Sequence, residues 1–319
     1  MAERSKLIMM YDPDKVKEAN SETLKLYNKY KMDMELRELS PTTIAAYESD
    51  LCQWFSYIYD NQGNQSITEL TEDDLTEFFY YCKKEGNNSR RIKRRMSSIS
   101  ALYNYLMKKR LIKENPMMFI DRPKKDVDVT TQTFLSKEQV KLMEQTLQEY
   151  TESHGGNSQL QTYALFSLST MARVTAISNI KWEQIDFEER VCNDVLEKEG
   201  KVVTLYFSAK VAILLQNLKQ YRITNNIDDG GYVFITAVNT KADAGTLFEW
   251  CKKIGKMINV PTLHPHDFRH SGSQLLKLAG CPIEEISELL HHESVDTTRK
   301  FYLKADKRKI RETKDKYEI

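Results

Sequence analysis

Residues 264–294 have the sequence HPHDFRHSGSQLLKLAGCPIEEISELLHHES and contain five of the six histidines of the chain. A metal site is one interpretation, but the stretch has neither an HExxH pattern nor the Cys and His spacing of zinc sites. His266 and Arg269 are three residues apart, so a helix places the imidazole and the guanidinium on one face. This pair suits a phosphate group, because both side chains donate hydrogen bonds to anionic oxygen atoms. We therefore predict a phosphate site here, and no metal.

The chain has 319 residues and a mass of 37.3 kDa, which predicts two domains that each bury a core. With 40% hydrophobic and 29% charged residues, the composition is typical of a folded globular protein and excludes collagen-like and disordered classes. The five cysteines lie far apart without a CxxC pair, so we expect free, mostly buried thiols. No signal peptide or membrane-spanning run is evident, and we expect a cytoplasmic protein without a membrane partner.

Positive charge is concentrated in two stretches, although the net charge of the chain is only +1. Residues 89–125 hold twelve basic residues against two acidic ones, and residues 299–319 hold nine against four. Concentrated basic residues favour binding to a phosphate backbone, since each one releases condensed counterions. The residues that we expect to contact phosphate are Arg90, Arg91, Lys93, Arg94, Arg95, Lys124 and Lys125. A solvated helix face is the alternative interpretation.

The N-terminal part of the chain predicts a bundle of helices. Ser40 is followed by a proline, the pattern of an N-cap and a first helical residue, and Thr71 begins a capping box. Residues 89–106 carry apolar residues at three- and four-residue steps, which predicts another helix. We predict a four- or five-helix bundle over residues 33–118, preceded by an N-terminal extension over residues 1–32.

The remainder predicts a second domain that combines helices with a small sheet. Residues 119–133 are polar and without apolar periodicity, so we expect a linker there, followed by a domain over residues 134–305 and a tail over residues 306–319. The predicted strands cover residues 193–196, 201–207 and 232–235, and the first two flank a hairpin turn. The expected fold class is mainly α with a small β-sheet.

These features together resemble the tyrosine recombinase (phage integrase) family. Its C-terminal domain carries an arginine, a hairpin lysine, an HxxR box, a second histidine and a tyrosine, in that order. The matching positions here are, in order, Arg173, Lys198 or Lys201, His266 with Arg269, His292 and Tyr302. The basic bundle is similar to the family's helical, SAM-like core-binding domain, and Thr42 and Thr43 at the start of one of its helices are further candidate DNA contacts.

The resemblance implies a bacterial or phage-encoded protein that cuts and rejoins double-stranded DNA at specific sites through a 3′-phosphotyrosyl intermediate. Arg173 and Arg269 would hold the non-bridging phosphate oxygens, and His266 and His292 would add hydrogen bonds. Tyr302 would be the nucleophile, and the hairpin lysine would protonate the departing 5′ oxygen. The covalent link conserves the phosphodiester energy, so no metal, ATP or other cofactor is implied. We expect self-association on DNA.

Three positions depart from the family pattern. Ala176 stands where the family usually has an acid, and Met171 and His291 stand where it usually has glycine. A protein that kept its DNA-binding surfaces and lost the chemistry would act as a transcriptional repressor of the temperate phage type, and this is our alternative. A third candidate is an architectural protein that bends DNA without site preference. We expect His264, His270 and His291 to pack or cap rather than to react.

Overall fold

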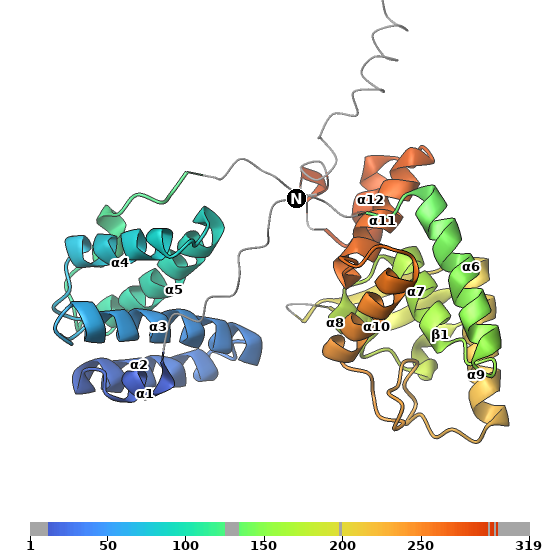
Figure 1. Cartoon of the computed structure of the whole chain (residues 1–319), viewed down its shortest axis with the longest axis horizontal. Helices are drawn as coiled ribbons and strands as arrows, with labels where there is room; N and C mark the ends of the chain where they lie inside the picture. The colour runs from blue at the N-terminus through green and yellow to red at the C-terminus, as the bar shows by residue number, and fades with distance from the viewer. Residues whose placement is uncertain (1–11, 125–133, 198–199, 293, 297, 299–319) are drawn as a thin grey trace, which may run out of the picture. The chain divides into compact units, whose positions relative to one another are not determined.

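The structure is a computed structural model, and it describes residues 12–124, 134–197, 200–292, 294–296 and 298 (Figure 1). The chain divides into two compact units, Met1–Thr130 and Thr131–Ile319. Each unit has a hydrophobic core of its own, as the chain length predicts. Within the described ranges, no helix combines the length and the apolar character that crossing a bilayer requires. All five cysteines are free, and four of them are buried.

The N-terminal unit is a helical bundle. Its elements are α1 (Pro13–Lys17), α2 (Ser21–Leu36), α3 (Pro41–Asn61), α4 (Glu72–Lys84), α5 (Ser89–Lys108) and the 3-10 helix η1 (Pro116–Phe119). The Ser40 hydroxyl accepts a hydrogen bond from the backbone N–H of Thr43 at 3.2 Å. Thr71 and Asp74 form the predicted capping box. The predicted starts of α3 and α4 are therefore confirmed.

Helix α2 lies mostly within the segment predicted as an N-terminal extension, but it is part of the bundle. Its apolar side chains recur at helical spacing and enter the same core as Trp54 of α3 and Leu102 of α5. Tyr30 and Met34, near the C-terminal end of α2, are 1% and 0% exposed. An amphipathic helix of this kind is stabilised by burying its apolar face, so α2 packs on the bundle instead of extending from it.

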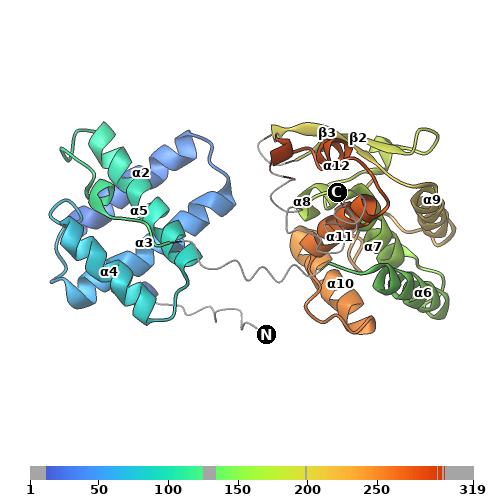
Figure 2. The ribbon, with the colours of Figure 1, turned by 90° about the horizontal axis from the view of Figure 1, so that it is seen from above.

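The C-terminal unit combines helices with a three-stranded sheet (Figure 2). Its helices are α6 (Lys137–Ser153), α7 (Gln159–Thr170), α8 (Val174–Ile177), η2 (Trp182–Gln184), α9 (Ala209–Thr224), α10 (Ala244–Met257), α11 (Pro265–Leu278) and α12 (Ile283–Leu289). The strands are β1 (Ile185–Asp186), β2 (Val191–Leu196) and β3 (Val202–Tyr206), paired antiparallel in the order β1-β2-β3. The β2–β3 pair confirms the predicted hairpin.

The strand predicted over residues 232–235 is wrong. Tyr232 and Ile235 each make only an isolated bridge, to Lys181 and Lys241 respectively. Val233 and Phe234 between them are 0% and 1% exposed, so the apolar run reflects burial in the core and not a place in the sheet.

Helix α7 is central to the C-terminal unit. It is buried along most of its length and packs against α6, α9 and α11. Gly272 of α11 permits the close approach of α7, because a Cβ atom there would lie 2.3 Å from the carbonyl oxygen of Leu168. This contact holds α11, which carries His266 and Arg269, against the C-terminal end of α7.

Candidate functional site

Helix α11 begins at the HPHDFRH sequence. His264 is the N-cap, and its Nδ1 accepts a hydrogen bond from the backbone N–H of His266 at 3.1 Å. The carboxylate of Asp267 accepts from the backbone N–H of His264 at 2.8 Å, which completes a capping box. Pro265 occupies the first helical position, where an N–H would have no partner within the helix. The capping role expected of His264 is confirmed, and His266 and Arg269 lie in the first turns of one helix.

Arg269 is buried, with 5% of its surface exposed, and it joins three segments of the chain. Its guanidinium donates hydrogen bonds to the backbone carbonyl oxygens of Met171, 2.7 Å away, and Leu290, 2.6 Å away. It also lies 3.2 Å from Nε2 of His292. These contacts fix the guanidinium between the C-terminal ends of α7 and α12.

Two residues in the left-handed region shape the backbone around Arg269. Met171 ends α7 with φ of 54°, and His291 follows α12 with φ of 51°. This conformation costs a residue with a Cβ atom roughly 1–2 kcal/mol. Met171 and His291 stand at the two positions where the resemblance leads us to expect glycine. The backbone therefore keeps the conformation that glycine favours, although neither residue is glycine.

Arg173 precedes α8 and lies two residues beyond the left-handed turn at Met171. Its guanidinium forms an ion pair with the carboxylate of Glu197, the residue that follows β2. The Arg173 side chain is 32% exposed, whereas that of Glu197 is 1% exposed. The same carboxylate oxygen, Glu197 Oε2, lies 3.9 Å from Nδ1 of His291, whose Nε2 is 3.2 Å from the carbonyl oxygen of Thr204. A buried acid thus lies between Arg173 and His291.

Glu197 is ionised in spite of its burial. Burial alone would raise the pKa of this carboxyl group, but His291, Arg173 and Arg269 outweigh it and hold the pKa below its ordinary value. Glu197 is the residue of this site that the sequence did not single out. The one signal in the sequence that could have indicated Glu197 is its position beside the two hairpin lysines. Its partner Arg173 is 24 positions away, so no local pattern connects Glu197 with Arg173.

His292 is held as a neutral imidazole. Burial lowers its pKa to about 4, and the charges of Arg269 and Arg173 act in the same direction. A guanidinium only donates hydrogen bonds, so Nε2 of His292 accepts from Arg269 and the ring proton of this tautomer is on Nδ1. That Nδ1 lies 2.8 Å from Oγ1 of Thr298, which can accept the proton.

The other predicted residues of the C-terminal unit lie around this centre. Burial of the ring, His270 and Arg269 together lower the pKa of His266, so this imidazole is also neutral at pH 7. Burial and Arg269 lower the pKa of His270 as well. Lys201 is exposed, and its Nζ donates to the carbonyl oxygen of His291 at 3.3 Å. Lys198 and Tyr302 lie outside the described residues.

The arrangement brings two guanidinium groups, an ammonium group and neutral imidazoles to one site. Such a set binds an anion with several oxygen atoms, and it stabilises the additional negative charge that develops when a phosphodiester is attacked. In the part of the chain that the structure describes, no group of three His, Cys, Asp or Glu side chains is suited to hold a metal ion.

The basic residues of α5 are divided between surface and core. Arg90 is exposed, and Arg91 and Lys93 are half-buried. Arg94 has a side chain that is 51% exposed, and its guanidinium lies 2.6 Å from the carboxylate of Asp50, whose side chain is 0% exposed. Arg94 therefore has a structural partner inside the bundle, in addition to any contact that it makes outside.

Arg95 departs from the predicted surface position. It is 1% exposed, and its guanidinium donates to Oε1 of Gln53 and to Sγ of Cys82, the latter at 3.0 Å. The reason is its place on α5, because it follows Ile92 by three residues and precedes Ile99 by four, on the buried face of the helix. Arg95 holds α5 to α3 and α4 and is not available to DNA in this structure.

Of the remaining candidate DNA contacts, Thr42 and Lys124 lie at the surface of the same unit. Thr42 is exposed, and the hydroxyl of Thr43 is 2.8 Å from that of Ser40, so Thr43 takes part in the cap of α3. Lys124 is exposed, and Lys125 lies outside the described residues.

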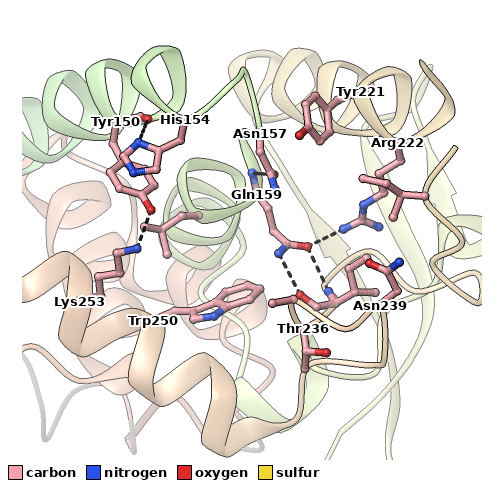
Figure 3. Close-up of a pocket in the computed structure, with 14 residues that line it drawn as sticks. Tyr150, His154, Asn157, Gln159, Tyr221, Arg222, Thr236, Asn239, Trp250 and Lys253 are labelled. Carbon is pink, nitrogen blue, oxygen red and sulfur yellow. Dashed lines mark hydrogen bonds between the residues drawn. The ribbon is translucent and has the colours of Figure 1, made fainter. Parts of the chain in front are cut away.

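A cavity of about 510 Å³ in the C-terminal unit contains none of the predicted site residues (Figure 3). Its polar side chains bind one another. Gln159 Oε1 accepts from Arg222 at 2.6 Å, and Lys253 donates to the hydroxyl of Tyr150 at 2.6 Å. His154 stacks on the ring of Tyr150, with 3.8 Å between the ring centroids. This cavity is separate from the site around Arg269.

Comparison with known families matches most of the chain. Residues 133–309 match the phage integrase family, and residues 28–110 match the N-terminal SAM-like domain of phage integrases. The chain is 28% identical over 304 residues to tyrosine recombinase XerC of Leptospira interrogans, which covers 94% of each protein. It is 26% identical over 311 residues to tyrosine recombinase XerC of Pediococcus pentosaceus, which covers 93% of this chain and 97% of that protein.

Solved structures with the same fold include two integrases in complex with DNA. The Tn1549 transposon integrase in complex with circular intermediate DNA superposes with a TM-score of 0.69 at 18% identity, over 91% of this chain and 97% of that one. A lambda integrase dimer bound to a COC′ core site superposes with a TM-score of 0.64 at 15% identity, over 85% of this chain and 95% of that one. At these identities the likeness concerns the fold alone. It confirms the predicted fold class, a helical SAM-like domain with a mixed catalytic-type domain.

Proposed function

Because the chain belongs to the phage integrase family, whose members are tyrosine recombinases, we propose that it cuts and rejoins double-stranded DNA at specific sites through a 3′-phosphotyrosyl intermediate. The observation that carries the proposal is the convergence of Arg173, Arg269 and His292. Arg173 lies in the segment between α7 and α8, Arg269 lies on α11, and His292 follows α12. The guanidinium of Arg269 contacts the other two segments directly.

The two arginines would bind the scissile phosphate. Arg269 is pre-oriented by the carbonyl oxygens of Met171 and Leu290, and Arg173 by the carboxylate of Glu197. Neither guanidinium needs to reorganise when charge develops on the phosphate, and this is the condition under which electrostatic stabilisation contributes most. The neutral imidazole of His266 can supply one N–H donor without adding a full charge. His292 would supply one only after its ring proton moves from Nδ1 to Nε2, because Nε2 accepts from Arg269 in this structure.

Tyr302 is the proposed nucleophile. A phenol has an ordinary pKa near 10 and attacks poorly until nearby cations stabilise its anion and the attacked phosphate. The proposed attack of the Tyr302 oxygen forms a bond to phosphorus and breaks the bond from phosphorus to the 5′ oxygen of the leaving strand. Either Lys198 or Lys201 gives that oxygen its proton. The energy of the broken phosphodiester stays in the phosphotyrosyl bond, so the rejoining step needs no further input.

The N-terminal unit would supply affinity for the DNA backbone. Its exposed or half-buried basic residues at the start of α5, together with Thr42 and Lys124 at the surface, suit phosphate contacts more than base recognition. Self-association on DNA is part of the proposal. It is supported by the lambda integrase structures, which are a dimer on a COC′ core site and a tetramer on a Holliday junction.

Covalent trapping tests the function. Purified protein is mixed with nicked fragments of its host genome and denatured with detergent, and DNA that remains attached to protein is recovered. Attachment by wild type and none by Tyr302→Phe supports a recombinase and identifies its site. Strong, site-selective binding without attachment would overturn the proposal in favour of the repressor alternative. Binding that bulk DNA competes away equally from every fragment would favour an architectural protein.

A further inference from the structure

The carboxylate of Glu197 is almost completely buried beside the guanidinium of Arg173, and no other carboxylate pairs with Arg173 among the described residues. Ala176, three residues beyond Arg173 on α8, is 1% exposed and has no polar group that could hold the arginine. An ion pair with a buried acid is therefore the main contact that orients Arg173 in this structure. Breaking such a pair by removing one partner leaves the other charge buried and uncompensated.

We infer that Glu197 is a positioning residue for strand transfer, which holds Arg173 in the orientation that binds the scissile phosphate. The inference rests on the proposed function. It also bears on one departure from the family pattern, because the chain lacks an acid at Ala176 and carries Glu197 beside the hairpin lysines. The acid that contacts Arg173 in this chain thus lies at the end of β2 and not on α8.

The unequal burial of the two side chains supports this role. Glu197 is 1% exposed and Arg173 is 32% exposed, so the carboxylate lies on the protein side of the guanidinium and part of the guanidinium stays open to solvent. A guanidinium has five N–H donors, and one carboxylate leaves several of them for a phosphate. Glu197 therefore orients Arg173 without occupying all of its binding capacity.

Glu197 also connects Arg173 to the hairpin and to the end of α12. Its backbone N–H donates to the carbonyl oxygen of Lys201 at 2.8 Å, which closes the hairpin turn. Lys201 in turn donates from Nζ to the carbonyl oxygen of His291, and Nδ1 of His291 lies 3.9 Å from the Glu197 carboxylate. The acid is thus a common neighbour of Arg173, a hairpin lysine and the residue before His292.

The opposite role would be inhibition, with the carboxylate occupying the place of the phosphate until DNA displaces it. The two roles predict opposite effects of Glu197→Gln, which removes the charge and keeps the shape. A positioning residue is needed in the reacting complex, so the variant reacts more slowly. An inhibitory carboxylate is absent from the reacting complex, so the variant reacts as fast as wild type or faster.

The test measures the single-turnover rate of covalent attachment at saturating DNA, together with the dissociation constant for the same DNA. We expect Glu197→Gln to lower the rate of attachment on the order of 10²-fold, because a misplaced reacting group has an effect of this size. The dissociation constant of the variant for DNA should stay close to that of wild type. Glu197→Asp should recover part of the rate. Glu189→Gln, at an exposed glutamate between β1 and β2, is the matched control and should react like wild type. A Glu197→Gln rate equal to or above that of wild type overturns the inference.

A double-mutant cycle distinguishes positioning from general damage to the fold. If Glu197 acts through Arg173, Glu197→Gln has no further effect on the residual rate of Arg173→Ala. If the rate loss of the double variant instead equals the product of the two single losses, Glu197 does not act through Arg173. Thermal unfolding of each variant, monitored by circular dichroism, identifies any that have simply failed to fold.

A second readout does not depend on activity. Nitrogen NMR of the arginine side chains detects guanidinium groups whose protons exchange slowly because they are ion-paired, and Arg173→Lys assigns the Arg173 signal. We expect slow exchange in wild type and in Glu189→Gln, and fast exchange in Glu197→Gln. If wild type never attaches to DNA, the proposed function fails, while NMR still decides whether Glu197 holds Arg173. An Arg173 signal unchanged in Glu197→Gln contradicts the inference.

Discussion

The guanidinium of Arg269 donates a hydrogen bond to the backbone carbonyl oxygen of Met171, 2.7 Å away at the left-handed end of α7. The acceptor belongs to the backbone, so its position depends on the conformation of the turn and not on the side chain that residue 171 carries. This explains how a methionine can stand where glycine is usual without displacing the arginine. The side chain of Met171 is 1% exposed and packs with Ile286 and Leu290, so it also contributes to the core between α7 and α12.

Met171→Gly therefore has opposing effects on stability. Loss of a buried methionine side chain costs about 2–5 kcal/mol, and relief of the left-handed conformation returns about 1–2 kcal/mol. We expect the free energy of unfolding to fall by up to about 4 kcal/mol, measured by chemical denaturation, while covalent attachment to DNA continues. A variant that is more stable than wild type would show that packing around residue 171 contributes little. Loss of attachment in a folded variant would contradict the backbone argument.

The neutral state of His292 predicts a dependence of stability on pH. Folding lowers its pKa from an ordinary value of about 6.5 to about 4, through burial and then through Arg269 and Arg173. The unfolded chain binds the proton more readily, so the stabilisation is complete above about pH 6.5 and is lost as the pH falls toward 4. We expect the Tm of wild type to fall across this window, and to fall less in His292→Asn. Equal decreases in the two proteins would contradict the assignment.

The basic residues at the start of α5, exposed at Arg90 and half-buried at Lys93, predict the salt dependence of DNA binding. We expect Arg90→Ala with Lys93→Ala to weaken binding and to reduce the slope of log affinity against log salt by about 2, roughly one for each phosphate that the variant no longer neutralises. Lys25→Ala with Lys29→Ala removes two exposed charges from α2 of the same unit and is the control. An unchanged slope in the first pair, or an equal change in both pairs, would exclude α5 as the helix that follows the phosphate backbone.

Arg94 should affect the stability of the bundle as well as DNA binding. Burial raises the pKa of Asp50, and Arg94, Ser98 and Arg95 counteract that rise. Arg94→Ala removes one of these partners from a fully buried carboxylate, and we expect the bundle to lose about 1–2 kcal/mol, since Arg94 itself is half exposed. Adding Asp50→Asn should recover part of the loss in thermal unfolding. A stable Arg94→Ala variant would show that Ser98 and Arg95 suffice for Asp50.

Local signals in the sequence predicted the elements whose causes are local. The caps at Ser40 and Thr71 lie within three residues of the groups they bind. The burial of Arg95 could also have been predicted from the sequence, because Arg95 shares the helical spacing of Ile92 and Ile99. Its charge suggested a position at the surface instead.

Contacts between distant segments could not be predicted in the same way. Glu197 reaches Arg173 only because the hairpin folds over the turn that follows α7, and no periodicity connects the two residues. The run from Tyr232 to Ile235 has the composition of a strand, but it makes only isolated bridges, to Lys181 and Lys241, and joins neither edge of the sheet. In both cases tertiary packing, and not local preference, determines the outcome.

The most direct test of the central claim is to identify the amino acid that becomes attached to DNA. The covalent complex is digested with a protease and a nuclease, and the peptide that carries a nucleotide is sequenced by mass spectrometry. Our account predicts one modified peptide, with a 3′-phosphonucleotide on Tyr302, which is absent from Tyr302→Phe and strongly depleted in Arg269→Ala. Attachment at another residue, or site-selective binding that never yields a modified peptide, would contradict it.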